Sequence, residues 1–383
     1  MKKIKIDALS ENISDRMESD IKNNIISGAS VSVISPDDTL FKAHFGTLSA
    51  EDKTPPNNST LFRMASMTKP VTAVAVMTLY DKGLLEIDDP VEKYLPQFKN
   101  MYIAEMIDGK AEKVRKAQTT LTIKHLLTHT SGLVSGSSGE FYANKLTDET
   151  NKTLKDTVDY YSGTGLGFEP YTENQYNATA AFDVLARIAE MISDMNYADF
   201  LKKYVTDPCE MYDTAFVPNN GQWERIIPMH KKENGKSGIS EMKKGCVFGN
   251  VPVTHYLGGA GLISSLGDYT SFARMLLNKG VINGNRIISE KAVKLISTAQ
   301  VPESIMPGNE RWGLGVRVIT SENYRFLPVG AFGWSGAYGT HFWIDPVNSI
   351  AAVYMKNSMF DGGSGAVTAA NFEKDVFNSF AES

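Results

Sequence analysis

The sequence has little that would place the protein on nucleic acid, in a membrane or outside the cell. Its 383 residues include 39 Lys and Arg against 44 Asp and Glu, a formal net charge of −5. Without a basic excess, nucleic acid is not an expected partner. The lysines at the N-terminus are not followed by the apolar segment of a signal peptide, and no apolar run approaches the length of a membrane span. We therefore expect a cytoplasmic protein that acts on small molecules.

Cysteines and metal-binding patterns are also scarce. Cys209 and Cys246 are the only cysteines, so one disulfide is possible, but we expect two free thiols in a reducing compartment. His125 and His129 are four residues apart, a spacing also found in zinc hydrolases. That zinc motif requires Glu directly after the first His, and Leu126 stands there. We expect structural roles for both histidines, and neither a metal nor an organic cofactor.

One segment, FRMASMTKPVTAVAVMTL at residues 62–79, is too apolar for a surface helix. It has almost no polar face after its proline, a pattern typical of a helix buried on all sides. Pro70 has no N–H and is tolerated in the first turn, so the helix should begin between Ser66 and Lys69. We expect it to end near Gly83.

Ser66 and Lys69 are the candidate reactive pair at the start of this helix. A cation in the first turn opposes the helix dipole, so stability alone would favour an acidic residue. A lysine whose ammonium reaches solvent is the ordinary alternative. The spacing of three residues, however, lets the two side chains meet on one side of a turn. Burial and the positive helix end both favour a neutral amine, which can take a proton from a serine nucleophile.

Strand patterns lie at the two ends of the chain and helical patterns lie between them. An amphipathic helix that Gly28 can end precedes a hairpin of GASVSVI and TLFKAHFG. Residues 312–319, 324–332, 339–346 and 349–357 predict a strand meander. Helices are predicted at residues 182–192, 265–278, 289–297 and 366–380, with a short one capped by Thr122; Ser135–Gly139 and Gly163–Gly167 are predicted loops at the rim of a cleft.

This arrangement predicts an α+β fold. Residues 1–95 and 250–383 would form one antiparallel sheet flanked by helices, because strands from both termini must pair to build it. Residues 96–249 would form a mainly helical subdomain inserted between its halves. We expect the chemistry in the cleft between the two parts.

Five segments in this order resemble the serine β-lactamase and penicillin-binding-protein-like superfamily. They are Ser66-Met67-Thr68-Lys69 in its setting, LTIKHLLTHTSGL, FEPYTENQY, GGAGLISSLGDYTSFARMLLN and FGWSGAYGTHFWIDP. A lone Ser-x-x-Lys occurs by chance, whereas the five together are specific. The closest similarity is to the class C β-lactamase-related carboxylesterases, or family VIII esterases, and it covers about Gly28 to Asn357. It implies a β-lactamase/transpeptidase-like fold.

The resemblance also implies a catalytic tyrosine from the helical part of the chain. It gives Ser66 the role of nucleophile, Lys69 that of its proton partner, and Tyr176 that of a phenol sharing the proton. Packing at a loop edge is the alternative for Tyr176, and Tyr171 is the alternative tyrosine. Lactamases and peptidases usually read Tyr-x-Asn here, but this chain has Ala178 at the third position. The amide that would hold a substrate amide is therefore displaced or missing.

The last element is the sequence Trp334-Ser335-Gly336-Ala337, which we expect to bind substrate. The corresponding sequence in lactamases resembles Lys-Thr-Gly, and its lysine binds a carboxylate of the substrate. Trp334 cannot pair with a carboxylate, so a site of this kind suits neutral acyl esters. The N–H groups of Ala337 and Ser66 would form the oxyanion hole, and Gly336 permits close backbone approach. GWSG resembles a nucleophile elbow, but Ala337 replaces its final glycine and the context is a strand.

The resemblance thus implies a serine hydrolase that cleaves carboxylic esters of small molecules through a Ser acyl-enzyme. A β-lactamase or D-stereospecific peptidase is one alternative. A catalytically silent ligand-binding protein on the same fold is another, although such a protein would not require Ser66, Lys69 and a tyrosine together. The sequence leaves the natural substrate and the oligomeric state open.

Overall fold

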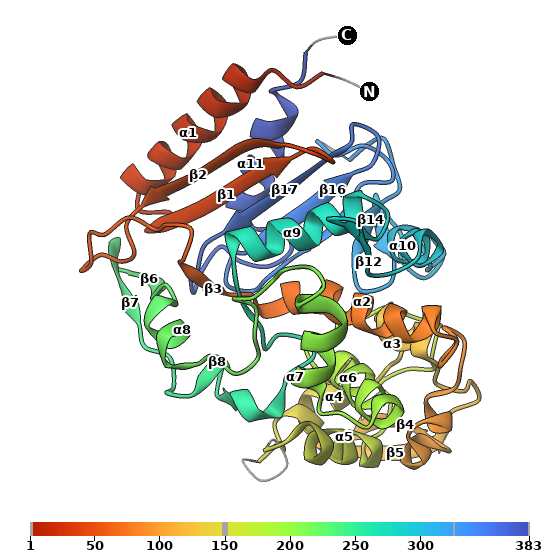
Figure 1. Cartoon of the computed structure of the whole chain (residues 1–383). Helices are drawn as coiled ribbons and strands as arrows, with labels where there is room; N and C mark the ends of the chain where they lie inside the picture. The colour runs from red at the N-terminus through yellow and green to blue at the C-terminus, as the bar shows by residue number, and fades with distance from the viewer. Residues whose placement is uncertain (1–2, 148–151, 325, 382–383) are drawn as a thin grey trace.

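Strands from both ends of the chain form one antiparallel sheet in the computed structural model, which describes residues 3–147, 152–324 and 326–381 (Figure 1). The strands are β1 (Gly28–Ile34), β2 (Thr39–Gly46), β13 (Glu310–Trp312), β14 (Arg317–Ile319), β15 (Phe332–Ser335), β16 (His341–Asp345) and β17 (Ile350–Met355). Their order is β13-β14-β15-β16-β17-β1-β2. Because β1 pairs with β17, with Ser30 opposite Met355, the first hairpin lies beside the last strands. The predicted antiparallel sheet built from both termini is confirmed.

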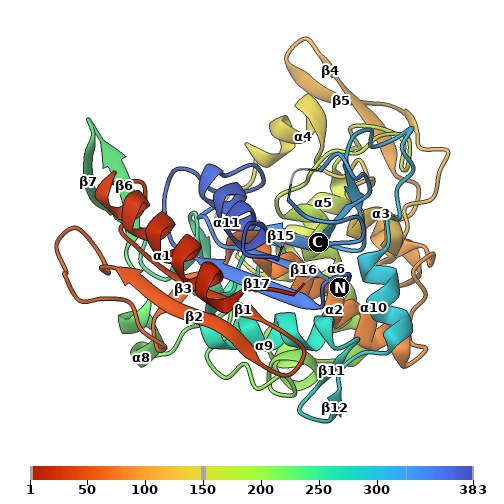
Figure 2. The same ribbon diagram turned by 90° about the horizontal axis from the view of Figure 1, so that it is seen from above.

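Helices cover both faces of this sheet, so the central strands β1, β15, β16 and β17 are buried along their whole length. The flanking helices are α1 (Ile6–Lys22), α2 (Thr68–Asp81), α9 (Leu266–Leu277), α10 (Glu290–Ser297) and α11 (Val367–Phe377). Val31 and Tyr354 share a core with α1 and α11, and Figure 2 shows α1 running along the hairpin of β1 and β2. Val353 and Met355 face the core that contains α2 and α9. Successive residues of β17 thus point into opposite cores, as the period of two in a strand requires.

The middle of the chain contains short helices and several small hairpins. The helices are α3 (Ile123–Leu127), α4 (Gly136–Ala143), α5 (Leu154–Gly163), α6 (Ala180–Ser193), α7 (Tyr197–Leu201) and α8 (Asn220–Arg225). The paired strands are β4 (Tyr102–Ile107) with β5 (Lys110–Lys116), β6 (Met229–Glu233) with β7 (Lys236–Ser240), β8 (Cys246–Phe248) with β9 (Val251–Pro252), and β11 (Val281–Ile282) with β12 (Asn285–Arg286). Strand β3 (Leu61–Arg63) pairs with β10 (Ile263–Ser265) and leads into α2.

The apolar helix behaves as its sequence predicted. A short 3₁₀ turn, η1 (Ala65–Met67), precedes α2, and every residue of α2 from Thr68 to Leu79 is buried. Gly83 follows the helix with φ of 67°, a left-handed conformation that suits glycine. The predicted helices at residues 182–192, 265–278, 289–297 and 366–380 correspond to α6, α9, α10 and α11, and the side chain of Thr122 caps α3.

Some local predictions were wrong. Helix α1 ends at Lys22 rather than at Gly28, because Asn24 takes a left-handed φ of 54° first. Ser135–Gly139 is the start of helix α4, not a loop. Residues 326–331 are not a strand, and Arg325 lies outside the described residues. The β4–β5 hairpin was missed because the charged residues of KAEKVRK hide any alternation.

Two features bear on the cellular expectations drawn from composition. Cys209 and Cys246 are both free and buried. Within residues 3–147, 152–324 and 326–381, no helix combines the length and the apolar character that a bilayer span requires.

Candidate active site

The backbone before Ser66 is held in an unusual conformation. Ala65 has φ of 45°, in the left-handed region that alanine rarely adopts. Such strain persists only where the surroundings enforce it, and it is concentrated at functional sites. Ser66 follows in η1 and is 7% exposed. The turn therefore places the serine at the start of α2, buried but still reachable.

Lys69 points back at this serine from the first turn of α2. Its Nζ atom lies 3.3 Å from Ser66 Oγ and donates to the carbonyl oxygens of Ala178 at 2.6 Å and Gly259 at 2.9 Å. The side chain is fully buried. Two carbonyls thus use two of the lysine hydrogens, and the remaining position of the nitrogen faces Ser66 Oγ. In a neutral amine that position is a lone pair, which can accept a proton.

Tyr176 is the tyrosine that the structure brings to Ser66. Its hydroxyl donates to Ser66 Oγ at 2.6 Å, and Trp334 Nε1 donates to the same phenol oxygen at 3.4 Å. Tyr171, the alternative, instead donates to the carbonyl of Gln300 at 2.8 Å. The serine hydroxyl therefore lies between an amine and a phenol.

The residues after Tyr176 hold the backbone rather than offer an amide to a ligand. Asn177 is buried; its amide nitrogen donates to Leu133 O at 2.9 Å and Val134 O at 3.0 Å, and its oxygen accepts from the N–H groups of Thr179 and Ala181. This fixed turn directs the Ala178 carbonyl at Lys69.

Sequence reasoning missed the carbonyls of Ala178 and Gly259, because backbone groups leave no residue-type signal. The available signal was the double glycine, Gly258-Gly259. A Cβ atom on Gly259 would lie 2.7 Å from Ala178 O and 3.4 Å from Lys69 Nζ, so a larger residue would crowd the amine.

The end of β15 is tied to the segment before Ser66. Thr340 Oγ1 donates to Met64 O at 3.0 Å, and Gly336 N donates to Thr340 O at 2.7 Å. A Cβ on Gly336 would lie 2.3 Å from Met64 O, so only glycine permits this approach. Within the described part of the chain, neither Ser66 N–H nor Ala337 N–H donates to a backbone carbonyl. Both donors thus remain available to a ligand.

Aromatic rings form the wall behind Tyr176. The ring centroid of Tyr176 lies 5.3 Å from that of Trp334 and 4.7 Å from that of His129, and Trp312 lies 4.7 Å from Trp334. Burial, and then the charge of Lys69, hold the pKa of His129 well below its ordinary value. A neutral His129 accepts from Asn177 N at 3.2 Å. The site therefore has one apolar side.

The histidine pair has the contacts of structural residues. His125 closes the capping box of α3 through its Nδ1, and His129 holds the turn after Tyr176. Over the residues that the structure describes, no group of three His, Cys, Asp or Glu side chains is arranged as metal ligands would be.

Ser335 turns to the opposite side of β15 from Trp334. Its hydroxyl lies 2.9 Å from His341 Nδ1, and His341 Nε2 lies 3.1 Å from Glu373 Oε1. All three side chains are buried. The expected contact of Ser335 with substrate stays a prediction.

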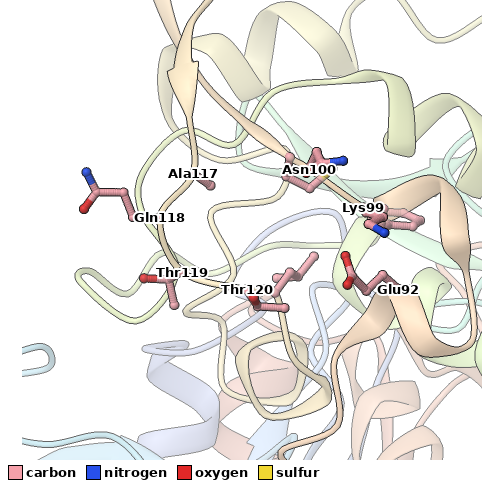
Figure 3. A pocket seen from close by; sticks show the side chains of 10 residues that line it. Glu92, Lys99, Asn100, Ala117, Gln118, Thr119 and Thr120 are labelled. Carbon is pink, nitrogen blue, oxygen red and sulfur yellow. The ribbon is translucent and has the colours of Figure 1, made fainter.

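A separate polar pocket of about 180 Å³ lies where the segment after β5 meets the short turns after α2 (Figure 3). Glu92, Lys99, Asn100 and Thr119 are among its lining residues. None of the expected site residues lines this pocket, so it is not part of the arrangement around Ser66.

Comparison with known proteins gives the chain a family. A family model described as Beta-lactamase matches residues 9–372. Esterase EstB from Burkholderia gladioli is 26% identical over 371 residues, which cover 90% of this chain and 89% of that protein. Protein Rv1367c from Mycobacterium tuberculosis is 28% identical over 348 residues, covering 86% of each chain.

Solved structures share the fold along nearly the whole chain. EstCE1, described as a hydrolase with promiscuous acyltransferase activity, has a TM-score of 0.82 at 21% identity and covers 97% of this chain and 99% of its own. A family VIII carboxylesterase has a TM-score of 0.76 at 18% identity and covers 97% of both chains. The expected β-lactamase/transpeptidase-like fold is confirmed. The chain belongs to the Beta-lactamase family, as a serine hydrolase.

Proposed function

We propose that the protein is a carboxylesterase that forms an acyl-enzyme on Ser66. The observation that carries the proposal is the position of Ser66 Oγ, 3.3 Å from Lys69 Nζ and 2.6 Å from Tyr176 Oη. A serine hydroxyl is a weak nucleophile and needs an adjacent group that removes its proton. Here two such groups meet at one oxygen, which supports acyl transfer better than passive binding.

Each step of the reaction has a residue near Ser66 to perform it. Ser66 Oγ attacks the ester carbonyl as its proton passes to Lys69 in its neutral amine form, or to Tyr176 in its phenolate form. The N–H groups of Ser66 and Ala337 stabilise the negative charge on the carbonyl oxygen. The C–O bond then breaks, and the alcohol leaves with a proton returned through Tyr176. Water attacks the acyl-enzyme and gives a proton to the same pair; the bond between Ser66 Oγ and the acyl carbon breaks, the acid is released, and the pair returns the proton to Ser66 Oγ.

The groups around the serine favour an ester over a lactam or a peptide. Trp334 places an aromatic ring where lactamases carry a cation, and the amide of Asn177 is used within the protein. The names of the relative Esterase EstB and of the family VIII carboxylesterase point the same way. A β-lactamase or D-stereospecific peptidase, and a silent binding protein, are the alternatives to be tested.

Hydrolysis of p-nitrophenyl butyrate by the wild-type protein and by Ser66→Ala tests the proposal. We expect release of p-nitrophenol that Ser66→Ala abolishes and that Ser162→Ala, in α5 away from the site, leaves unchanged. Intact mass after treatment with a fluorophosphonate should show one adduct in the wild type and none in Ser66→Ala. Absence of an adduct on folded wild-type protein would favour the silent binding protein. Nitrocefin turnover equal to ester turnover would favour the lactamase.

A further inference from the structure

A cavity of about 690 Å³ opens next to strand β3, the strand that leads to Ser66. Three parts of the chain line it: strand β3, helix α8, and the segment that runs into the first residue of β8. The lining residues are Arg63 from β3, Asn220, Trp223 and Glu224 from α8, and Met242, Lys243, Lys244, Gly245 and Cys246 from the third segment. The segment after α8 lies beside β3, because Leu61 pairs with Ile226. None of the lining residues takes part in the contacts around Lys69 and Tyr176. The cavity therefore requires its own explanation.

Arg63 is a buried cation without a counter-charge. It is 8% exposed, and one of its terminal nitrogens donates to the carbonyl of Ile227 at 3.2 Å. Its Nε atom is buried and has no acceptor, and no carboxylate of the described residues forms an ion pair with it. Burial is the largest influence and lowers the pKa of this guanidinium, while the nearby Tyr338 raises it. Buried charges in proteins are normally paired with an opposite charge, and among the described residues Arg63 has a carbonyl acceptor but no carboxylate.

The rest of the cavity adds positive charge and apolar surface. Lys243 and Lys244 are exposed at its lining, against the single carboxylate of Glu224. Trp223 and Met242 supply apolar surface between the charges. A ligand with an anionic end and a hydrocarbon chain matches this combination.

The cavity is close to the reacting serine. Arg63 and Ser66 are three residues apart, so their backbones are separated by at most about 10 Å. Met242, which lines the cavity, also packs on a cluster of Ala65 and Tyr338. These two residues directly precede Ser66 and follow Ala337. The cavity and Ser66 thus lie on neighbouring parts of the chain, with the cluster of Ala65, Tyr338 and Met242 next to both.

We propose that this cavity binds a carboxylate carried by the ester substrate at a distance from the bond that is cleaved. The inference rests on the proposed esterase function and specifies its substrate class: hemiesters of dicarboxylic acids, or esters whose alcohol part carries a carboxylate. Arg63 is the main binding group, and Lys243 and Lys244 attract the anion. Arg63 on β3 would thus supply the cation that Trp334 on β15 cannot supply.

Two matched substrate pairs test the proposal and locate the carboxylate. The p-nitrophenyl hemiester of adipic acid is compared with p-nitrophenyl heptanoate for the acyl side. The butyrate ester of p-hydroxybenzoate is compared with that of p-hydroxyacetophenone for the alcohol side. In one pair, kcat/KM should favour the charged member by about tenfold, the scale of hydrogen bonds between charged groups. The pair that shows the preference identifies the side.

Variants show whether the preference comes from this cavity. Arg63→Met should lower the ratio of charged to neutral kcat/KM about tenfold. Lys243→Gln combined with Lys244→Gln should lower it by about two- to fivefold, an effect that salt reduces. Lys232→Gln, an exposed lysine outside the cavity, should leave the ratio unchanged. The charged and neutral esters differ in intrinsic reactivity. Comparing the ratio of their kcat/KM values between the wild type and each variant cancels that difference. If Arg63→Met does not fold, the lysine pair decides.

Binding to Ser66→Ala separates failure of this inference from failure of the proposed function. By calorimetry, adipate should bind this variant and its neutral analogue adipamide should not. If the wild type hydrolyses no ester, the proposed function fails, and adipate binding still decides the role of the cavity. Equal hydrolysis of both members of each pair, a preference that survives both cavity variants, or absence of adipate binding would each overturn the inference.

Discussion

Two buried clusters on opposite sides of strand β15 hold their basic side chains differently. On the Trp334 side, Lys69 is held by two backbone carbonyls and by Ser66, and no carboxylate of the described residues forms an ion pair with it. On the Ser335 side, Arg317 is ion-paired with Glu373 and, at 3.4 Å, with Glu310. Neighbouring residues of a strand point to opposite faces, so one short strand separates the two clusters.

The difference supports the proposal that the cluster around Lys69 carries out the chemistry. Burial alone would raise the pKa of Glu373, but hydrogen bonding from His341 and the charge of Arg317 hold it below its ordinary value. Every member of that cluster is thus committed to a partner, which fixes its charge. Lys69 instead keeps one position for the hydroxyl of Ser66, the proposed nucleophile. We expect the Glu373 cluster, formed by Ser335, His341, Arg317 and Glu373, to determine stability. We expect the Lys69 cluster, formed by Ser66, Lys69 and Tyr176, to determine activity.

Substitution of Lys69 should have the largest effect on activity. Lys69→Met removes the amine but keeps most of the side-chain volume, so kcat/KM for p-nitrophenyl butyrate should fall by about 10²–10⁴-fold, the usual contribution of a proton-transfer group. The carbonyls of Ala178 and Gly259 lose their donor, so thermal unfolding must be recorded alongside. Activity within tenfold of the wild type would contradict the role of Lys69 and the contrast between the clusters.

Substitution of Glu373 should reverse that pattern. Glu373→Gln leaves Arg317 buried without a full counter-charge, and breaking a buried ion pair costs about 3–5 kcal/mol of unfolding free energy. Urea denaturation measures the loss, and kcat/KM of the protein that remains folded should change far less than in Lys69→Met. Glu303→Gln, which breaks the exposed pair with Arg311, is the matched control and should cost about 1 kcal/mol or less.

A pair of tyrosine substitutions sharpens the comparison within the site. Tyr176→Phe removes the hydroxyl that donates to Ser66 Oγ, so kcat/KM should fall by about 10²-fold. Because Tyr176 is 39% exposed, the free energy of unfolding should change little. Tyr171→Phe should show the opposite: near-normal activity and a loss of about 1 kcal/mol from its hydrogen bond to Gln300. Equal loss of activity in both variants would refute the assignment of Tyr176.

The sequence predicted one cluster and not the other, for physical reasons. Ser66 and Lys69 are three residues apart on one helix, so their meeting follows from local geometry. Tyr176 could be placed only through the resemblance to a family, because its contact with Ser66 joins distant segments. The Arg317–Glu373 pair joins β14 to α11, and no local spacing connects them.

The roles of backbone groups and of unpaired side chains could not be predicted from the sequence either. The Ala178 carbonyl carries no residue-type signal, and Asn177 could be read as a displaced substrate contact until its four hydrogen bonds within the protein were seen. No residue-type signal marked Arg63 in the sequence either. Its missing counter-charge becomes visible only when its surroundings are known.

The smallest expected effect concerns His230, a buried histidine outside both clusters whose ring nitrogens have no partner within the described residues. Burial lowers its pKa to about 4. Between pH 6.5 and 4 the unfolded chain therefore binds a proton there that the folded protein does not, so stability falls as the pH falls, by about 1.4 kcal/mol per pH unit. His230→Leu should reduce the slope of unfolding free energy against pH by about that amount between pH 6 and 5 in urea denaturation, and the remaining slope belongs to the other buried histidines. An unchanged slope would assign the pH dependence to the other buried histidines, including His341 in the Glu373 cluster.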